Sequence, residues 1–146
     1  MTKHPTILSW PLTSARTSGH ETAVMAGLAD GAELTLAIAD TDSERQLGLG
    51  NRDQLPHDGM LFVFDQPARY GIWMKGMRFP IDIVWLRNGE VVHVVQDAQP
   101  QQGLTDAQLP IFSPPSDADA VVELASGRAT QLKLSVGWDL EVASLQ

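Results

Sequence analysis

The chain has 146 residues, of which 43% are hydrophobic, and it carries a formal net charge of −8. This length suits one domain with a core of its own. Because the chain contains no cysteine, disulfides, thiol catalysis and thiolate metal sites are excluded. The negative charge argues against nucleic acid or an anionic membrane surface as a partner.

The apolar runs of the chain are all shorter than the roughly 20 residues needed to span a bilayer. Near the N-terminus, Pro5, Trp10 and Pro11 interrupt any apolar region that would resemble a signal peptide. We therefore expect a cytoplasmic protein without a membrane partner.

Residues 1–31 show no sustained pattern and are expected to form an N-terminal extension. Thr6 to Leu12 suits a short edge strand between two prolines. Glu21 to Leu28 suits either a strand or a helical turn. The main domain is expected to occupy residues 32–146.

Clear alternation begins at Glu33 and places Leu34, Leu36 and Ile38 on one face of a strand. Thr41 and Glu44 have the spacing of a capping box, which predicts a short helix. Residues 59–64 are apolar on both faces, which is typical of a strand covered from both sides.

Further strands are predicted over residues 70–75, 81–87 and 90–96. Asn88-Gly89 between the last two predicts a tight type I′ hairpin turn. Residues 97–116 are polar and contain four prolines. A loop of this length in a small domain is usually functional or mobile.

The C-terminal part predicts a strand over residues 120–124, a helix capped by Ser126 and followed by Gly137, and a last strand over 138–142. Six or more strands, two short helices and no alternating β-α-β pattern predict a mainly β fold. We expect a single-domain antiparallel β-barrel-like fold.

Several short motifs follow one another along the chain: Glu44-Arg45, Gly48-Leu49, Arg52, Gly59 to Phe64, Trp73-Met74-Lys75, Pro80 to Ile83, Gly89 with Val91, Val122-Glu123-Leu124, Gly127 and Gly137. In this order, between about residues 33 and 143, they resemble the domain-of-unknown-function family 192 (uncharacterised protein family 0127). The resemblance implies a small, mainly β, barrel-like domain of bacteria and archaea that is often exported and has no established activity.

The chain departs from the family pattern in three ways. Gly50 stands where the family has methionine, and Gly76 and Met77 stand where it has asparagine and threonine. In addition, no secretory or lipoprotein-like leader is seen.

Two charged residues lie within the most apolar part of the chain. Lys75 and Asp82 flank a loop, residues 76–80, that is short enough to join antiparallel strands and place them opposite each other. They form either the polar floor of a pocket for an anionic group or a buried ion pair that sets strand register.

Three more residues are candidates for ligand binding. Arg52 has the planar donor group that suits a carboxylate or phosphate, and it could join Lys75. Glu44 either contributes to the site or only caps its helix, and Trp73 either stacks on a ligand ring or belongs to the core. Glu123 alternates with apolar neighbours, so its pattern allows either a solvent-facing or a site position.

Motifs for metal or cofactor binding are missing. The four histidines lack ligand spacing, and nucleophile-elbow and phosphate-loop motifs are absent. We therefore expect no metal and no cofactor.

The sequence is compatible with three functions. The first is a non-catalytic binding module for a small polar or anionic ligand, held near Lys75, Asp82 and Arg52. The second is an accessory domain that contacts a protein partner through residues 1–31 or 97–116. The third is a hydrolase or lyase with Asp82 as general base.

Overall fold

A computed structural model describes residues 6–145 of the chain. Its helices are short: α1 (Ser14–Thr17), α2 (Asp42–Leu47), α3 (Arg128–Gln131) and the 3-10 helix η1 (Asp106–Gln108). The strands are β1 (Thr22–Ala26), β2 (Leu34–Ala39), β3 (Gly59–Ala68), β4 (Ile72–Trp73), β5 (Ile81–Arg87), β6 (Glu90–Ala98), β7 (Ile111–Phe112), β8 (Ala118–Ala125) and β9 (Glu141–Leu145). None of the helices within residues 6–145 is long and apolar enough to cross a membrane.

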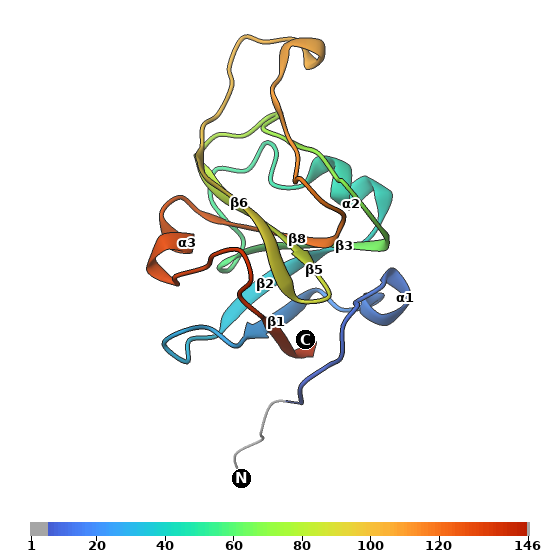
Figure 1. Ribbon diagram of the computed structural model, residues 1–146. Helices are drawn as coiled ribbons and strands as arrows, with labels where there is room; N and C mark the ends of the chain where they lie inside the picture. Colours follow the sequence, from blue (N-terminus) through green and yellow to red (C-terminus); the bar gives the residue numbers. More distant parts are fainter. Residues whose placement is uncertain (1–5, 146) are drawn as a thin grey trace.

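One sheet of seven strands forms the body of the molecule (Figure 1). Its strand order is β6-β5-β8-β3-β2-β1-β9, and β4 and β7 form a separate pair. The mainly β class is thus confirmed. The sheet is not a closed barrel, because β6 and β9 remain its two edges within residues 6–145. Nor is it wholly antiparallel, since β2 pairs with β3 in parallel. The crossover between these two strands contains α2.

Several local predictions are confirmed by the backbone. Thr41 accepts a hydrogen bond from the Glu44 amide and the Glu44 side chain accepts from Thr41, which completes the capping box of α2. Asn88 and Gly89 have φ of 49° and 83°, as a type I′ turn requires. Leu34, Leu36 and Ile38 are buried together on one face of β2.

Other local predictions were wrong. Gly127, not Ser126, precedes α3, and the Ser126 hydroxyl instead donates to the Asp97 carboxylate at 2.6 Å. The strand expected over residues 70–75 is reduced to β4. Three α-helices and one 3-10 helix stand in place of the two expected.

The segment expected to be an N-terminal extension contributes to the sheet. Residues 22–26 form β1, which pairs with β2 on one side and β9 on the other. Leu8 forms an isolated bridge with Val142. Residues 1–5 of the expected extension lie outside the described part of the chain.

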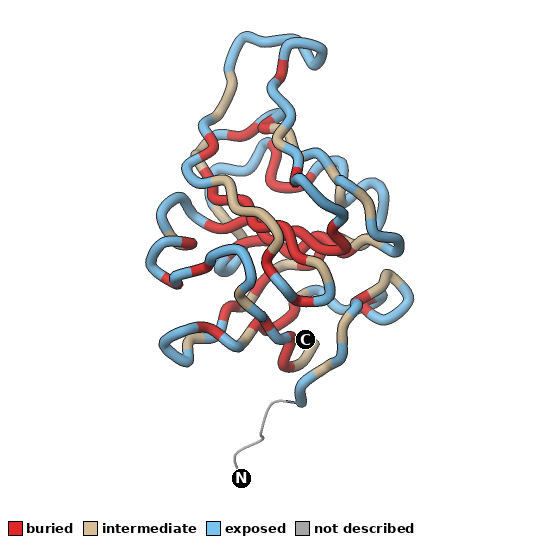
Figure 2. The backbone as a smooth tube through the Cα atoms, in the orientation of Figure 1, coloured by how far each residue is buried: buried red, intermediate tan, exposed pale blue. Residues whose placement is uncertain are grey.

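The core is divided between the two faces of the sheet, and the buried residues follow the central strands in Figure 2. Successive residues of β3, β5 and β8 alternate between two apolar clusters. Val122 and Leu124 belong to the first cluster, and Val121 belongs to the second. Alternation therefore places Glu123 on the second face, together with Met60 and Ile83, its partners on β3 and β5.

Gly59 provides a test of this central pairing. A Cβ atom at this position would clash with the backbone carbonyl oxygen of Glu123 on β8, and Gly59 also has a positive φ of 145°. We expect Gly59→Ala to lower the free energy of unfolding by about 2–5 kcal/mol, because alanine is strained at this φ and the two strands must also move apart. Chemical denaturation measures the change.

Gly103→Ala is the matched control, because Gly103 also has a positive φ, of 77°, but no atom within 4 Å of an added Cβ. Its effect should be about 1–2 kcal/mol, from the strained backbone conformation alone. Equal destabilisation by the two variants would contradict the close approach of β3 and β8.

Candidate functional site

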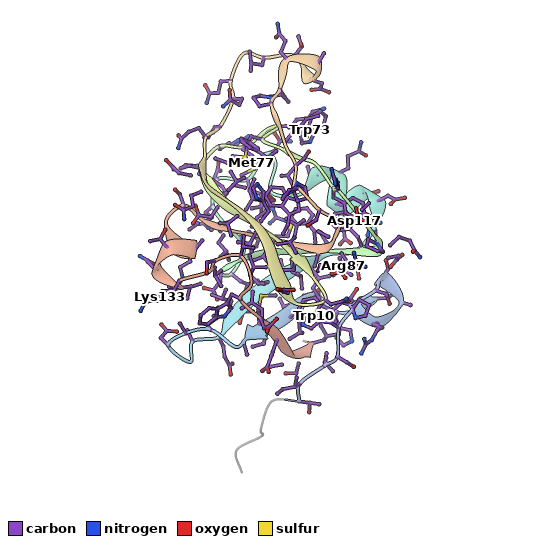
Figure 3. The ribbon with its side chains drawn as sticks, viewed as in Figure 1. Trp10, Trp73, Met77, Arg87, Asp117 and Lys133 are labelled. Carbon is purple, nitrogen blue, oxygen red and sulfur yellow. The ribbon has the colours of Figure 1, made fainter. Side chains whose placement is uncertain are left out.

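A cavity of about 370 Å³ lies on the second face of the sheet, between β3, α2 and the segment around β4. In Figure 3, Trp73 and Met77 lie at this end of the molecule, below the projecting loop that follows β6. The cavity is lined by Asp42, Arg45, Gln46, Leu47, Gly48, Leu49, Gly50, Phe62, Phe64, Tyr70, Gly71, Ile72, Trp73, Lys75, Met77 and Glu123. A neighbouring cavity of about 620 Å³ shares Gln46, Leu47, Gly50, Trp73 and Lys75 with it.

Two glycines allow the end of α2 to form one wall. An added Cβ on Gly48 would lie 3.1 Å from the ring of Phe62, so the absence of a side chain lets the helix end approach the sheet. An added Cβ on Gly50 would lie 3.0 Å from the carbonyl oxygens of both Leu47 and Lys75. At position 50, where this chain departs from the family pattern, the close backbone packing therefore favours glycine, which has no side chain.

Aromatic rings form the opposite wall, and two cations lie on their faces. Phe64 and Tyr70 stack with ring centroids 3.7 Å apart. The Arg45 guanidinium lies 5.5 Å from the centroid of Phe64, and the Lys75 ammonium lies 5.2 Å from that of Trp73. Both distances are within the range of cation–π attraction.

Both cations also have carboxylate partners. Arg45 donates to Asp42 at 2.8 Å and to the backbone carbonyl of Val63 at 2.8 Å. Lys75 donates to Asp106 of η1 at 2.7 Å, which connects the cavity wall to the loop between β6 and β7. These positive charges are thus balanced within the protein.

Glu123 is the exception among the charged residues of the cavity. It is only 4% exposed, and its carboxyl group has no hydrogen-bond partner among residues 6–145, since neither a hydrogen bond nor a neighbouring charge contributes to its pKa. Since no fully enclosed side-chain oxygen lacks a partner in this part of the chain, the Glu123 oxygens face the open space of the cavity. Burial raises the pKa of Glu123 to about 8, so the group is mostly protonated at neutral pH.

Two of the five predicted site residues, Trp73 and Lys75, line this cavity. The other three do not. Glu44 caps α2 as described, and Arg52 is exposed outside the cavity. Asp82 is fully buried on the other side of β5.

The predicted pairing of Lys75 with Asp82 was wrong. Lys75 follows β4, which pairs with β7, whereas β5 pairs with β6 and β8. The two side chains therefore have different partners: Lys75 contacts Asp106, and the carboxylate of Asp82 accepts hydrogen bonds from the backbone amides of Asp97, Gly127 and Ala129 at 2.9, 3.0 and 2.9 Å.

The sequence pattern around Glu123 did not predict that its side chain is buried. Its position between Val122 and Leu124 looks like that of a solvent-facing residue on a half-exposed strand. The available signal was the apolar character of the whole run 118–125, which indicates a strand covered on both faces. In a strand covered on both faces, a charged residue is buried whichever face its side chain occupies.

Within residues 6–145, no group of three His, Asp or Glu side chains is placed to hold a metal ion. The cavity instead combines aromatic walls, two partnered cations and one unpartnered carboxyl group. This combination defines a mainly β domain with a cavity bordered by one unpartnered carboxyl group, and the comparisons with known proteins bear on which family it represents.

The model of domain-of-unknown-function family 192, described as Uncharacterized ACR, matches residues 25–142. The chain belongs to this family, and the resemblance seen in its motifs is confirmed. The comparison with curated proteins found no match.

Two solved structures are similar to this chain. One, from Sinorhizobium meliloti 1021 and named as a candidate transcription regulator, is 27% identical, with a TM-score of 0.72 and coverage of 92% of this chain and 98% of that one. The other, a protein of unknown function from Novosphingobium aromaticivorans DSM 12444, is 23% identical, with a TM-score of 0.68 and coverage of 92% and 91%. The second similarity shows the fold alone.

Asp82 is expected to be essential for stability. Asp82→Asn replaces one carboxylate oxygen by an NH₂ group that faces backbone donors, so at least one buried charge-assisted hydrogen bond is lost. The free energy of unfolding should fall by about 3 kcal/mol, as measured by urea denaturation at pH 7. Asp53→Asn, which removes an exposed ion pair with Arg78, should change it by less than about 1 kcal/mol. Equal effects would contradict the structural role of Asp82.

Glu123 should make the stability depend on pH. Its pKa is about 8 in the folded protein and 4.5 ordinarily, so between these values the folded state holds a proton that the unfolded state has released. The stability contribution is therefore complete below about pH 4.5 and is lost as the pH rises towards 8, by up to about 1.4 kcal/mol per pH unit. Urea denaturation from pH 4.5 to 8.5 should show this slope in the wild type.

Glu123→Gln is nearly isosteric and cannot ionise, so it should lack that slope and become progressively more stable than the wild type as the pH rises. Parallel pH profiles of the two proteins would show that Glu123 is not buried as described.

Proposed function

We propose that this domain is a non-catalytic binding module that holds a small ligand in the cavity of about 370 Å³, with a polar group of the ligand meeting Glu123. The observation that carries this proposal is the unpartnered carboxyl group of Glu123, which is 4% exposed and faces open space. A buried polar group without a partner is unfavourable, and a bound ligand removes that cost.

The size and composition of the cavity support the proposal. Small-molecule sites usually occupy about 300–1,000 Å³ and combine apolar and aromatic walls with a few convergent polar groups. Here Phe62, Phe64, Tyr70 and Trp73 supply the aromatic surface. Glu123 and Phe62 project from paired central strands, so this side of the site is rigid before a ligand arrives.

Catalysis by Asp82 receives less support. Its carboxylate is fully buried and is engaged by three backbone amides, so a substrate has no access to it. The name of the similar Sinorhizobium meliloti structure does not lead us to propose contact with nucleic acid, because this chain has a net charge of −8.

A thermal-shift screen with small metabolites tests the proposal. A ligand at about 100 times its dissociation constant adds about 2.7 kcal/mol to the stability, which raises Tm by several degrees. Glu123→Gln should reduce the shift given by any such ligand. Each variant is compared with its own ligand-free Tm.

Asp119→Asn is the matched control, because Asp119 is a second buried carboxyl group of β8 that binds the Asn88 amide and does not line the cavity. It should retain the full shift. A ligand whose shift is unchanged by Glu123→Gln would overturn the assignment of Glu123 as the contact, and a screen without any shift would overturn the proposed function.

A further inference from the structure

We infer that the ligand presents a positively charged nitrogen group, such as a primary ammonium, to Glu123 and lies against the aromatic wall with an apolar or aromatic body. This inference rests on the proposed function and adds the chemical class of the ligand. It replaces the anionic ligand expected from Lys75 and Arg52, because the structure pairs Lys75 with Asp106 and leaves Arg52 outside the cavity.

The distribution of charge around the cavity carries the inference. The titratable and charged groups that face it are Asp42 and Arg45 from α2, Tyr70 and Lys75 from the segment around β4, and Glu123 itself. β3 and β5 place Met60 and Ile83 opposite Glu123, and Arg128 of α3 is half-buried and does not line the cavity. No cation of residues 6–145 forms an ion pair with Glu123.

The two cations of the wall are already satisfied. Arg45 lies 2.8 Å from Asp42, and Lys75 lies 2.7 Å from Asp106. An anionic ligand would have to compete with these carboxylates, whereas a cationic ligand would meet a carboxyl group that has no competitor. Once Glu123 is ionised, its carboxylate is therefore the one charge of the cavity lining without a partner, and a cation matches it.

The aromatic wall favours the same class of ligand. Ring faces attract cations, and the strength increases when water is excluded. In this cavity Phe64 and Trp73 already bind Arg45 and Lys75 in this way, so the ammonium of the ligand lies at Glu123 and its apolar body meets the rings. The net charge of −8 also raises the local concentration of cationic molecules around the protein.

An ammonium group binds the ionised form of Glu123, so binding must be coupled to the loss of one proton from the protein. That proton passes to solvent, and no other reactant is needed. Because the pKa of Glu123 is about 8, Glu123 is ionised in about half of the protein molecules at pH 8 and in about one in a hundred at pH 6. The apparent affinity should thus be about fifty-fold weaker at pH 6 than at pH 8.

Three probes of similar shape test the inference: benzylammonium, benzyl alcohol and benzoate. Each is titrated into the full chain at pH 6 and pH 8, and binding is followed by the amide NMR shifts of the residues that line the cavity. We expect benzylammonium to bind most tightly at pH 8 and about fifty-fold more weakly at pH 6. Glu123→Gln should weaken the binding of benzylammonium at pH 8 and remove the pH dependence of that binding. Asp119→Asn should retain the affinity at pH 8 and its pH dependence.

The other outcomes separate this inference from the proposed function. Tighter binding of benzoate or benzyl alcohol than of benzylammonium at pH 8 would overturn the cationic class but leave a working small-molecule cavity. The absence of shifts among the cavity residues with all three probes would overturn both.

Discussion

Strand β8 pairs with a neighbour on each side, and this pairing determines where the buried charges of the molecule lie. β5 and β3 flank it over most of its length, and both faces of the resulting sheet are covered by apolar clusters. Because side chains alternate along a strand, a shift of one residue would exchange the two faces. The register that buries Val122 and Leu124 on one face of the sheet therefore places the side chain of Glu123 on the opposite face. The cavity exists where this face is incompletely filled.

Asp82 and Glu123 show how the same chemical group serves two purposes in one sheet. They lie on adjacent strands at neighbouring register positions, with Asp82 opposite Leu124 and Ile83 opposite Glu123. The Asp82 carboxylate accepts hydrogen bonds from three backbone amides and thereby joins β5 to the end of β6 and to the start of α3. The Glu123 carboxyl group accepts no hydrogen bond from a backbone amide of residues 6–145. The number of donors that the fold supplies, and not burial itself, distinguishes the carboxylate of Asp82 from the unpartnered carboxyl group of Glu123.

The parts of the fold that were predictable from sequence are those set by local rules. The alternation of β2, the capping box of α2 and the turn at Asn88-Gly89 depend only on neighbouring residues, and the structure has all three. Pairing between distant strands was not predictable in this way. Lys75 and Asp82 are close in sequence, but Lys75 lies in the turn after β4 of the two-stranded sheet and Asp82 lies in β5 of the seven-stranded sheet. Glu123 gains its position from β3 and β5. The candidate site therefore contains only two of the residues expected, Trp73 and Lys75.

The two sides of the cavity differ in how firmly they are held. Glu123 and Phe62 project from paired central strands, whereas the opposite side depends on the Lys75–Asp106 and Arg45–Asp42 ion pairs. Lys75 and Asp106 are both more than half exposed, and exposed ion pairs contribute less than about 1 kcal/mol. The loop that carries Asp106 projects from the body of the molecule (Figure 1) and borders the neighbouring cavity. Opening of the Lys75–Asp106 contact requires the loss of only a weak ion pair, while Glu123 and Phe62 stay fixed by the sheet.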